Sequence, residues 1–284
     1  MMPPDHVVHA DVSGLPVSGS SSAWVASIGR DATFHMDFGS GRYRGSLIGM
    51  PYAVVGHDQP KVPVVFRYAS ESDPGPLPLP SDAPMEGTND DHHLLVLDQS
   101  ICHLHELWDA SAPSSPGGVW TAGSGASWDL RSNALRPAGW TSADAAGLPI
   151  LPTLVRYDEV AAGRIDHVLR MSAPVTRRGY LWPARHDASV RTDPSLPPFG
   201  AWFRLRSDFD TSPYGPQARV ILDAMKTHGV ILADHGPAWQ VGGVPDERWD
   251  NRQLLALHAL RGSDMVAVDQ SSLMLDPNSA QVRG

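Results

Sequence analysis

The stretch of residues 129–144 combines groups that could bind a substrate and transfer protons. Asp129 and Asp144 bound it, Arg136 and Trp140 lie within it, and its apolar residues follow neither helical nor strand spacing. Long structured loops often line binding sites, and glycoside hydrolysis uses two carboxylates. We therefore take the aspartates as candidate catalytic residues and Arg136 and Trp140 as candidate substrate-binding residues. The alternative is a surface loop held by its own Arg–Asp pairs.

A second candidate group lies in residues 165–171, where alternating apolar residues predict a strand. His167 shares one face with Ile165 and Leu169, and Arg170 lies on the other face. A histidine in an apolar row is more often a core residue with satisfied hydrogen bonds. Placed on the floor of a cleft, it would be a general base, and Arg170 or Arg136 could neutralise a uronate carboxylate. His167 is thus a candidate catalytic residue and Arg170 a candidate binding residue.

Residues 180–186 supply an aromatic group next to polar ones. Trp182 precedes Pro183 at the end of an expected strand, and His186 follows shortly after. A fixed tryptophan face packs well against the C–H groups of a sugar ring. Trp182 and His186 are therefore candidate substrate-binding residues, and the alternative is an aromatic cap over the core.

A carboxylate is also expected on the strand of residues 101–108. Glu106 shares a face with Leu104 and Cys102, and apolar neighbours raise the pKa of a carboxyl group, as a general acid requires. His103 and His105 share the other face at a spacing that metal ligands use on strands, but no third ligand follows at a fixed offset. The sequence therefore adds Glu106 to the candidate catalytic residues and leaves any metal or cofactor unknown.

These groups must be positioned by a mainly β fold. Alternation predicts further strands, and helical spacing appears only late in the chain, over 216–228 and from about 250. We expect one domain over 1–284, with an extended N-terminal segment over roughly 1–25. The architecture expected is a β-sandwich or jelly roll decorated by helices in its C-terminal third. The expected strands are 62–68, 94–97, 101–108, 165–171, 179–182, 201–206 and 230–233. Of these, 94–97 and 101–108 are expected to pair as a hairpin.

Composition limits the partners and the compartment. The 284 residues include 31 acidic and 22 basic side chains, a balance that disfavours nucleic acid and membrane surfaces as partners. Cys102 is the one cysteine and lies in an apolar run, which predicts a buried, inert thiol. Few lysines and loops rich in Pro, Gly and Ser are typical of exported β proteins. We expect a secreted or periplasmic protein from which a signal peptide has been removed.

Several runs together resemble a family of uncharacterised proteins, mostly predicted to be secreted, from soil bacteria and fungi. The resemblance implies a signal peptide in the natural precursor and transfers no activity and no catalytic residue. His235 stands where relatives carry Asn after Asp234. The runs that carry the resemblance are 72–76, 129–144, 157–159, 165–167, 182–186 and 245–250.

The leading hypothesis from the sequence is a carbohydrate-active enzyme, a glycoside hydrolase acting on a plant or microbial polysaccharide or oligosaccharide through paired carboxylates. A polysaccharide lyase with His167 as base is one alternative. A metal-dependent oxidase using His93, His167 and His186 is another, and a non-catalytic carbohydrate-binding module is a third. Folds of this class host all of these activities, so the fold alone does not choose among them.

Overall fold

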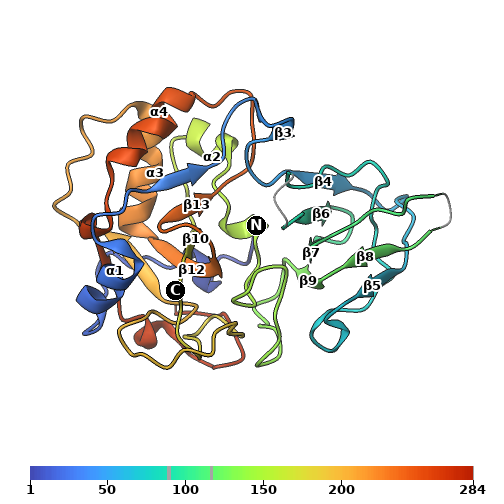
Figure 1. Ribbon diagram of the computed structural model, residues 1–284, viewed down its shortest axis with the longest axis horizontal. Coiled ribbons are helices and arrows are strands. Elements are labelled where there is room, and N and C mark those ends of the chain that lie inside the picture. The colour runs from blue at the N-terminus through green and yellow to red at the C-terminus, as the bar shows by residue number, and fades with distance from the viewer. Residues whose placement is uncertain (88–90, 116–117, 284) are drawn as a thin grey trace.

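The computed structural model describes residues 1–87, 91–115 and 118–283. It has two β-rich parts side by side: a larger one that carries the helices, on the left of Figure 1, and a smaller one on the right. Strands make up 25% of the chain and helices 18%, so the protein is mixed α/β with more strand than helix. In the described ranges no sheet closes and no clear sandwich is seen, in contrast to the expected sandwich or jelly roll.

The larger part is built on a six-stranded mixed sheet in the order β1-β13-β10-β12-β11-β14. The β1–β13 and β10–β12 pairs are parallel, and the other neighbours are antiparallel. Parallel neighbours require long crossover connections, and the connection from β10 to β12 carries a helix over Pro216–Thr227. The strands are β1 (His35–Asp37), β10 (Leu169–Ala173), β11 (Trp202–Leu205), β12 (Val230–His235), β13 (Gln240–Gly242) and β14 (Met265–Ala267).

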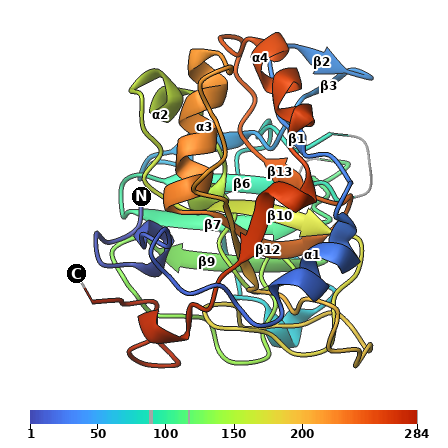
Figure 2. The same ribbon diagram turned by 90° about the vertical axis from the view of Figure 1, so that its left-hand side faces the viewer.

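The helices cover the face of this sheet that points away from the smaller part (Figure 2). They are α1 (Ser21–Gly29), α2 (Tyr157–Ala161), α3 (Pro216–Thr227) and α4 (Asn251–Ala256). Pro216 stands in the first turn of α3, where its missing N–H costs nothing, and Asp250 caps α4 by accepting from the Arg252 N–H. Nowhere in the described part of the chain is a helix long and apolar enough to cross a bilayer.

The smaller part contains a four-stranded sheet in the order β4-β6-β7-β9. Its β6–β7 hairpin is the one expected from the sequence, with Asp98 opposite His103. A short hairpin, β2 (Arg42–Tyr43) with β3 (Ser46–Leu47), and a parallel pair, β5 (Val64–Phe66) with β8 (Trp120–Ala122), complete the strands. The strands of the four-stranded sheet are β4 (Tyr52–Val55), β6 (Leu94–Asp98), β7 (His103–Trp108) and β9 (Ser124–Asp129).

Both faces of the four-stranded sheet are buried. On β6, Leu95 belongs to the large hydrophobic core, which also contains the helices and the six-stranded sheet. Its neighbours Leu94 and Val96 point the other way, into a separate small core under β5 and β8. This alternation follows from the two-residue period of a strand, and it explains why β6 reads as a continuous apolar run.

Several local predictions were wrong. The strand expected over 165–171 begins only at Leu169, and 179–182 forms no strand, because Gly179 has a φ of +93°, outside the β region. The N-terminal segment is not simply extended: it contains a short helical turn at Val7–His9 and the start of α1, which buries Trp24 and Ile28. Cys102 is exposed, in the turn between β6 and β7, with a φ of +55°.

Candidate functional site

A cleft of about 340 Å³ lies between the six-stranded sheet and the segment that leads into β6. Residues from β1, β10, β12 and β13 form one wall. The other is lined by the β2–β3 hairpin and by Glu86, Gly87, Asp91 and His93. The side chains that give it its chemistry are mostly charged. We call it the acidic cleft and define it by Asp37, Glu86, His93, Arg170, Asp234 and Gln240.

The register of the sheet places Asp37 and Arg170 on the same face. Asp37 pairs with Gly242 across β1 and β13. Because Met171 pairs with Val241, Arg170 lies opposite Gly242 from the other side. Laterally paired residues point to the same face of a sheet. A Cβ on Gly242 would come within 3.3 Å of the Arg170 Nη1 atom, so this glycine leaves room for the guanidinium.

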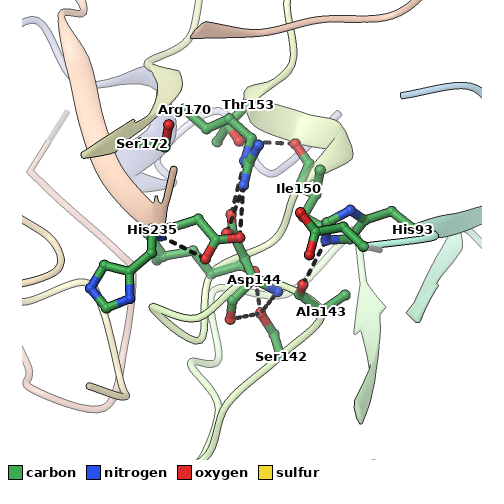
Figure 3. Close-up of polar contacts among 12 residues, drawn as sticks. His93, Ser142, Ala143, Asp144, Ile150, Thr153, Arg170, Ser172 and His235 are labelled. Carbon is green, nitrogen blue, oxygen red and sulfur yellow. Dashed lines mark hydrogen bonds and ion pairs between the residues drawn. The ribbon is translucent and has the colours of Figure 1, made fainter. Parts of the chain in front are cut away.

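Arg170 is the buried cation of the cleft (Figure 3). Its Nε donates to Asp144 Oδ2 at 3.0 Å and its Nη2 to Asp144 Oδ1 at 2.8 Å. Nη2 also donates to Asp234 Oδ2 at 3.4 Å. The two-contact pair with Asp144 fixes the guanidinium in one orientation, since both groups are planar. Arg170 is thus held by carboxylates of this chain and does not offer a free charge to a ligand.

Asp234 is the second acidic partner of Arg170. Burial raises the pKa of Asp234 well above its ordinary value, and the charge of Asp144 raises it further, while Arg170 opposes the shift. One guanidinium charge faces two carboxyl groups, and Asp144 holds the better geometry. Asp234 therefore keeps its proton to a higher pH than an ordinary aspartate does.

His93 and Glu86 form an ion pair across the cleft from Arg170. The His93 Nδ1 lies 2.5 Å from Glu86 Oε2, and Nε2 lies 3.0 Å from the Ala143 carbonyl oxygen. Burial alone would lower the pKa of His93, but the hydrogen bond and charge of Glu86 raise it to about 9. Both partners are acceptors, as a doubly protonated imidazolium requires. Burial would raise the pKa of Glu86, yet His93 outweighs it and lowers that pKa, so Glu86 is ionised.

Asp37 shows the opposite shift. Its pKa is raised, first by burial and then by the charge of Glu86. The same cleft therefore holds carboxyl groups with a raised pKa, Asp37 and Asp234, and one with a lowered pKa, Glu86. Two carboxyl groups with pKa values pushed apart are the arrangement from which acid and base roles arise.

A second hollow of about 320 Å³ borders the acidic cleft at Asp234, which lines both. Tyr68 and Trp108 from the smaller part form one side of it, and residues 141–145 and 186–188 form another. We call it the aromatic hollow and define it by Tyr68, Glu71, Trp108, Asp144, His186 and Asp234. The end of the loop expected to line a cleft does so here, together with His186.

The structure thus brings together some of the residues singled out from the sequence. Asp144 and Arg170 are in direct contact, and Asp144 and His186 line the same hollow. The His186 Nδ1 lies 2.7 Å from the Ala145 carbonyl oxygen, which fixes the ring against the loop. Trp182 lines neither hollow: its Nε1 donates to the Ser279 carbonyl at 3.0 Å, and its ring packs against the large core.

Glu106 is fully buried on the inner face of β7, away from both hollows. Its carboxyl group accepts from the Ile150 and Leu151 N–H groups and from Trp128 Nε1 at 2.8–3.0 Å. Burial raises its pKa to about 7, against the effect of these donors. The expected raised pKa is present, but the group ties the smaller sheet to the segment at residue 150 and meets no solvent.

Asp129, Arg136 and Trp140 also serve the fold. Asp129 ends β9 on the surface and pairs with Arg131, at 2.9 Å between Oδ1 and Nε. The Arg136 guanidinium is buried; it contacts Asp73 at 2.5 Å and lies 5.6 Å from the centre of the Trp140 ring. The Arg131–Asp129 pair lies within the loop, as the alternative prediction expected, whereas Arg136 ties the loop to Asp73 outside it.

His167 lies before β10 and not on it. Its Nδ1 is 2.8 Å from the Val168 carbonyl oxygen and its Nε2 is 3.1 Å from Glu159 Oε2. A carboxylate is nearby, as expected, but both ring nitrogens are engaged and the side chain lines neither hollow. Burial lowers the pKa of His167. The geometry is that of a core histidine.

The sequence reasoning missed Asp37, Glu86 and Asp234 as site residues. Asp234 directly follows the apolar run 230–233, and a carboxylate at the carboxyl end of a buried strand is a signal that could have singled it out. Asp37 ends a strand of three residues, too short for a readable period, and Glu86 lies in a loop. For these two, no local pattern marks the site.

In the ranges that the structure describes, no three His, Cys, Asp or Glu side chains come together in a way that would hold a metal ion. His93 and His186 contact neighbouring carbonyl oxygens and His167 is buried elsewhere, so the three-histidine set of the oxidase hypothesis is not assembled. The chain matches no family model, no curated protein and no solved structure. The resemblance to secreted proteins of soil bacteria and fungi therefore stays a prediction.

Proposed function

We propose that this protein is a glycoside hydrolase that acts on a polysaccharide or oligosaccharide in the acidic cleft, with Asp37 as general acid and Glu86 as base or nucleophile. The observation that carries the proposal is the opposite shift of the two pKa values within one cleft. The proposed catalytic carboxylates differ from those expected from the sequence, because Glu106 and Asp129 stabilise the fold instead.

In this proposal the proton of Asp37 passes to the glycosidic oxygen as the bond to the anomeric carbon breaks. Glu86 either removes a proton from the attacking water or attacks the anomeric carbon itself. His93 holds Glu86 ionised and oriented through the contact at 2.5 Å. Gln240 and Asp234 also line the cleft, and planar polar side chains of this kind suit sugar hydroxyls.

The charges around Arg170 favour hydrolysis over the lyase alternative. A lyase needs a cation that neutralises the uronate carboxylate next to the abstracted proton. Arg170 and Arg136 are both buried and paired with Asp144 and Asp73, and His167 has no ring nitrogen left for proton abstraction. We also propose that the protein acts outside the cytoplasm, where it would meet such a polymer.

The test is a panel of plant and microbial polysaccharides assayed for new reducing ends and, in parallel, for the absorbance of unsaturated products. Reducing ends should appear without that absorbance. Asp37→Asn and Glu86→Gln should each lower the rate at least about 100-fold, in the range of a lost acid or base. Asp129→Asn, an exposed carboxylate on β9, is the matched control and should keep the rate. Binding without cleavage would indicate a carbohydrate-binding module, and unsaturated products a lyase.

A further inference from the structure

The aromatic hollow has the composition of a sugar site, and the proposed reaction does not use it. Tyr68 and Trp108 both line it in a stacked arrangement, with ring centres 6.3 Å apart and planes inclined by 26°, and give it an aromatic surface. Glu71 and His186 line it as well, with His186 Nε2 3.7 Å from Glu71 Oε2, and offer an acceptor and an imidazole. Flat aromatic faces combined with planar polar groups bind sugar rings through C–H contacts and hydroxyls.

The aromatic surface is held in place before any ligand arrives. Trp108 Nε1 donates to Asp91 Oδ1 at 3.1 Å, and the Arg67 guanidinium carbon lies 5.3 Å from the centre of the indole. Tyr68 is 48% exposed, which leaves much of its ring open to a partner. Because the indole is already fixed, little conformational entropy is lost when a ring stacks on it.

The two hollows lie next to each other. Asp234 lines both of them, and Asp144 lines the aromatic hollow while holding Arg170 in the acidic cleft. On the other side, Asp91 lines the acidic cleft and accepts from Trp108 of the aromatic hollow. A ligand that extends beyond one hollow would therefore meet the residues of the other.

We propose that the aromatic hollow is a subsite that binds further sugar units of the chain cleaved in the acidic cleft, so that the substrate is a neutral polysaccharide or oligosaccharide and not a single-sugar glycoside. The inference rests on the proposed function. Glu71 and Asp187 line the hollow, and their charges disfavour a uronate chain. Each hollow is close to the lower end of the range of about 300–1,000 Å³ typical of small-molecule sites, which suits a chain that extends over both.

The test reads the hollow directly and does not depend on turnover. In protein labelled with ¹⁵N-tryptophan, the indole signal of Trp108 is assigned by its loss in Trp108→Phe. Cellohexaose, xylohexaose, laminarihexaose, mannohexaose and chitohexaose are titrated in, with their monosaccharides and hexagalacturonate for comparison. At least one neutral hexasaccharide should shift the Trp108 signal, and its monosaccharide should bind at least about tenfold more weakly.

Tyr68→Ala should weaken this binding about tenfold, while Tyr68→Phe, which keeps the ring, should not. Glu86→Gln should abolish cleavage and keep the Trp108 shift, so the two proposals fail separately. A shift of the Trp108 indole signal without cleavage by the natural protein would support sugar binding in the aromatic hollow and contradict the proposal of a hydrolase. Cleavage of hexasaccharides with an unmoved Trp108 signal, or a panel that leaves the signal unmoved up to about 10 mM, would overturn the subsite.

Discussion

Asp37 and Glu86 face one cleft, and their surroundings move their pKa values in opposite directions. Burial and the charge of Glu86 raise the pKa of Asp37, whereas His93 lowers that of Glu86 against the effect of burial. The charge of Glu86 thus takes part in setting the protonation state of Asp37, and His93 sets that of Glu86. The consequence is a pH window in which one is protonated and the other ionised.

The first prediction concerns the pH dependence of activity. Cleavage requires Glu86 to be ionised and Asp37 to be protonated. Because the pKa of Glu86 is lowered, Glu86 stays ionised at lower pH than an ordinary glutamate. Asp37 loses its proton as the pH rises through its raised pKa. The optimum should therefore be acidic, and kcat/KM should fall about tenfold per pH unit on the alkaline side. The measurement is kcat/KM against pH, with Asp37→Asn removing the alkaline limb. A rate that is constant between about pH 5 and 8 would contradict the assignment.

The second prediction concerns the buried pair of Arg170 and Asp144. Asp144→Ala leaves the guanidinium with only the longer contact to Asp234, and removing one partner of a buried pair typically costs about 3–5 kcal/mol. Replacing both residues, as in Asp144→Leu with Arg170→Met, should recover much of this loss. The measurement is the free energy of unfolding in urea for each single variant and the double variant. Losses that simply add would show that the two side chains are not coupled.

The third prediction separates the two interpretations of His167. His167→Ala removes the ring that contacts Glu159 Oε2 and the Val168 carbonyl oxygen, although Glu159 keeps its ion pair with Arg156. An unmade buried hydrogen bond costs about 1–3 kcal/mol. Activity per folded molecule should remain. His167→Gln, which can restore one of the contacts, should lose less stability. An unchanged melting temperature together with a collapse of activity would instead make His167 a catalytic residue.

The fourth prediction concerns stability against pH. Burial lowers the pKa of His6 to about 3 and that of His105 to about 4. Their contribution to the free energy of unfolding is therefore complete above about 6.5, the pKa of histidine in the unfolded chain, and is lost as the pH falls below it. His93 is the reverse case: with its pKa raised to about 9, its contribution is complete below about 6.5 and is lost as pH rises through 9. Stability should peak near neutral pH.

Unfolding in urea at a series of pH values measures this curve. His105→Gln should flatten the acid side, because the buried Nε2 atom of His105 has no hydrogen-bond partner among the described residues and burial lowers the pKa of the ring. His93→Gln should flatten the alkaline side and leave the acid side as it was. A curve that both substitutions leave unchanged would show that these histidines do not control the pH dependence.

The sequence predicts those elements that are long enough for their apolar pattern to repeat several times. The β6–β7 hairpin and α3 were both located, since alternation over 94–108 and helical spacing over 216–228 persist for several repeats. Strands β1, β13 and β14 have three residues each and carry no such signal. α1 was missed although Trp24, Val25 and Ile28 have helical spacing, because serines interrupt the apolar pattern.

The site was predicted only in its parts. Asp144 and Arg170 were both singled out, but as a catalytic acid and a substrate ligand, and their mutual pairing depends on packing between a loop and a strand 26 residues further on. Glu86 and His93 are close in sequence, yet their pairing depends on the path of a loop. Non-local contacts of this kind follow from the register of the sheets, which one sequence does not determine.

The strand β6 belongs to two hydrophobic cores at once, with Leu95 in one and Leu94 and Val96 in the other. Melting either core would remove support from the same backbone. We therefore expect the two parts of the molecule to unfold in a single cooperative transition. The same sharing leaves no hinge at this strand, so the walls of the acidic cleft would meet a ligand as a preformed, stiff surface.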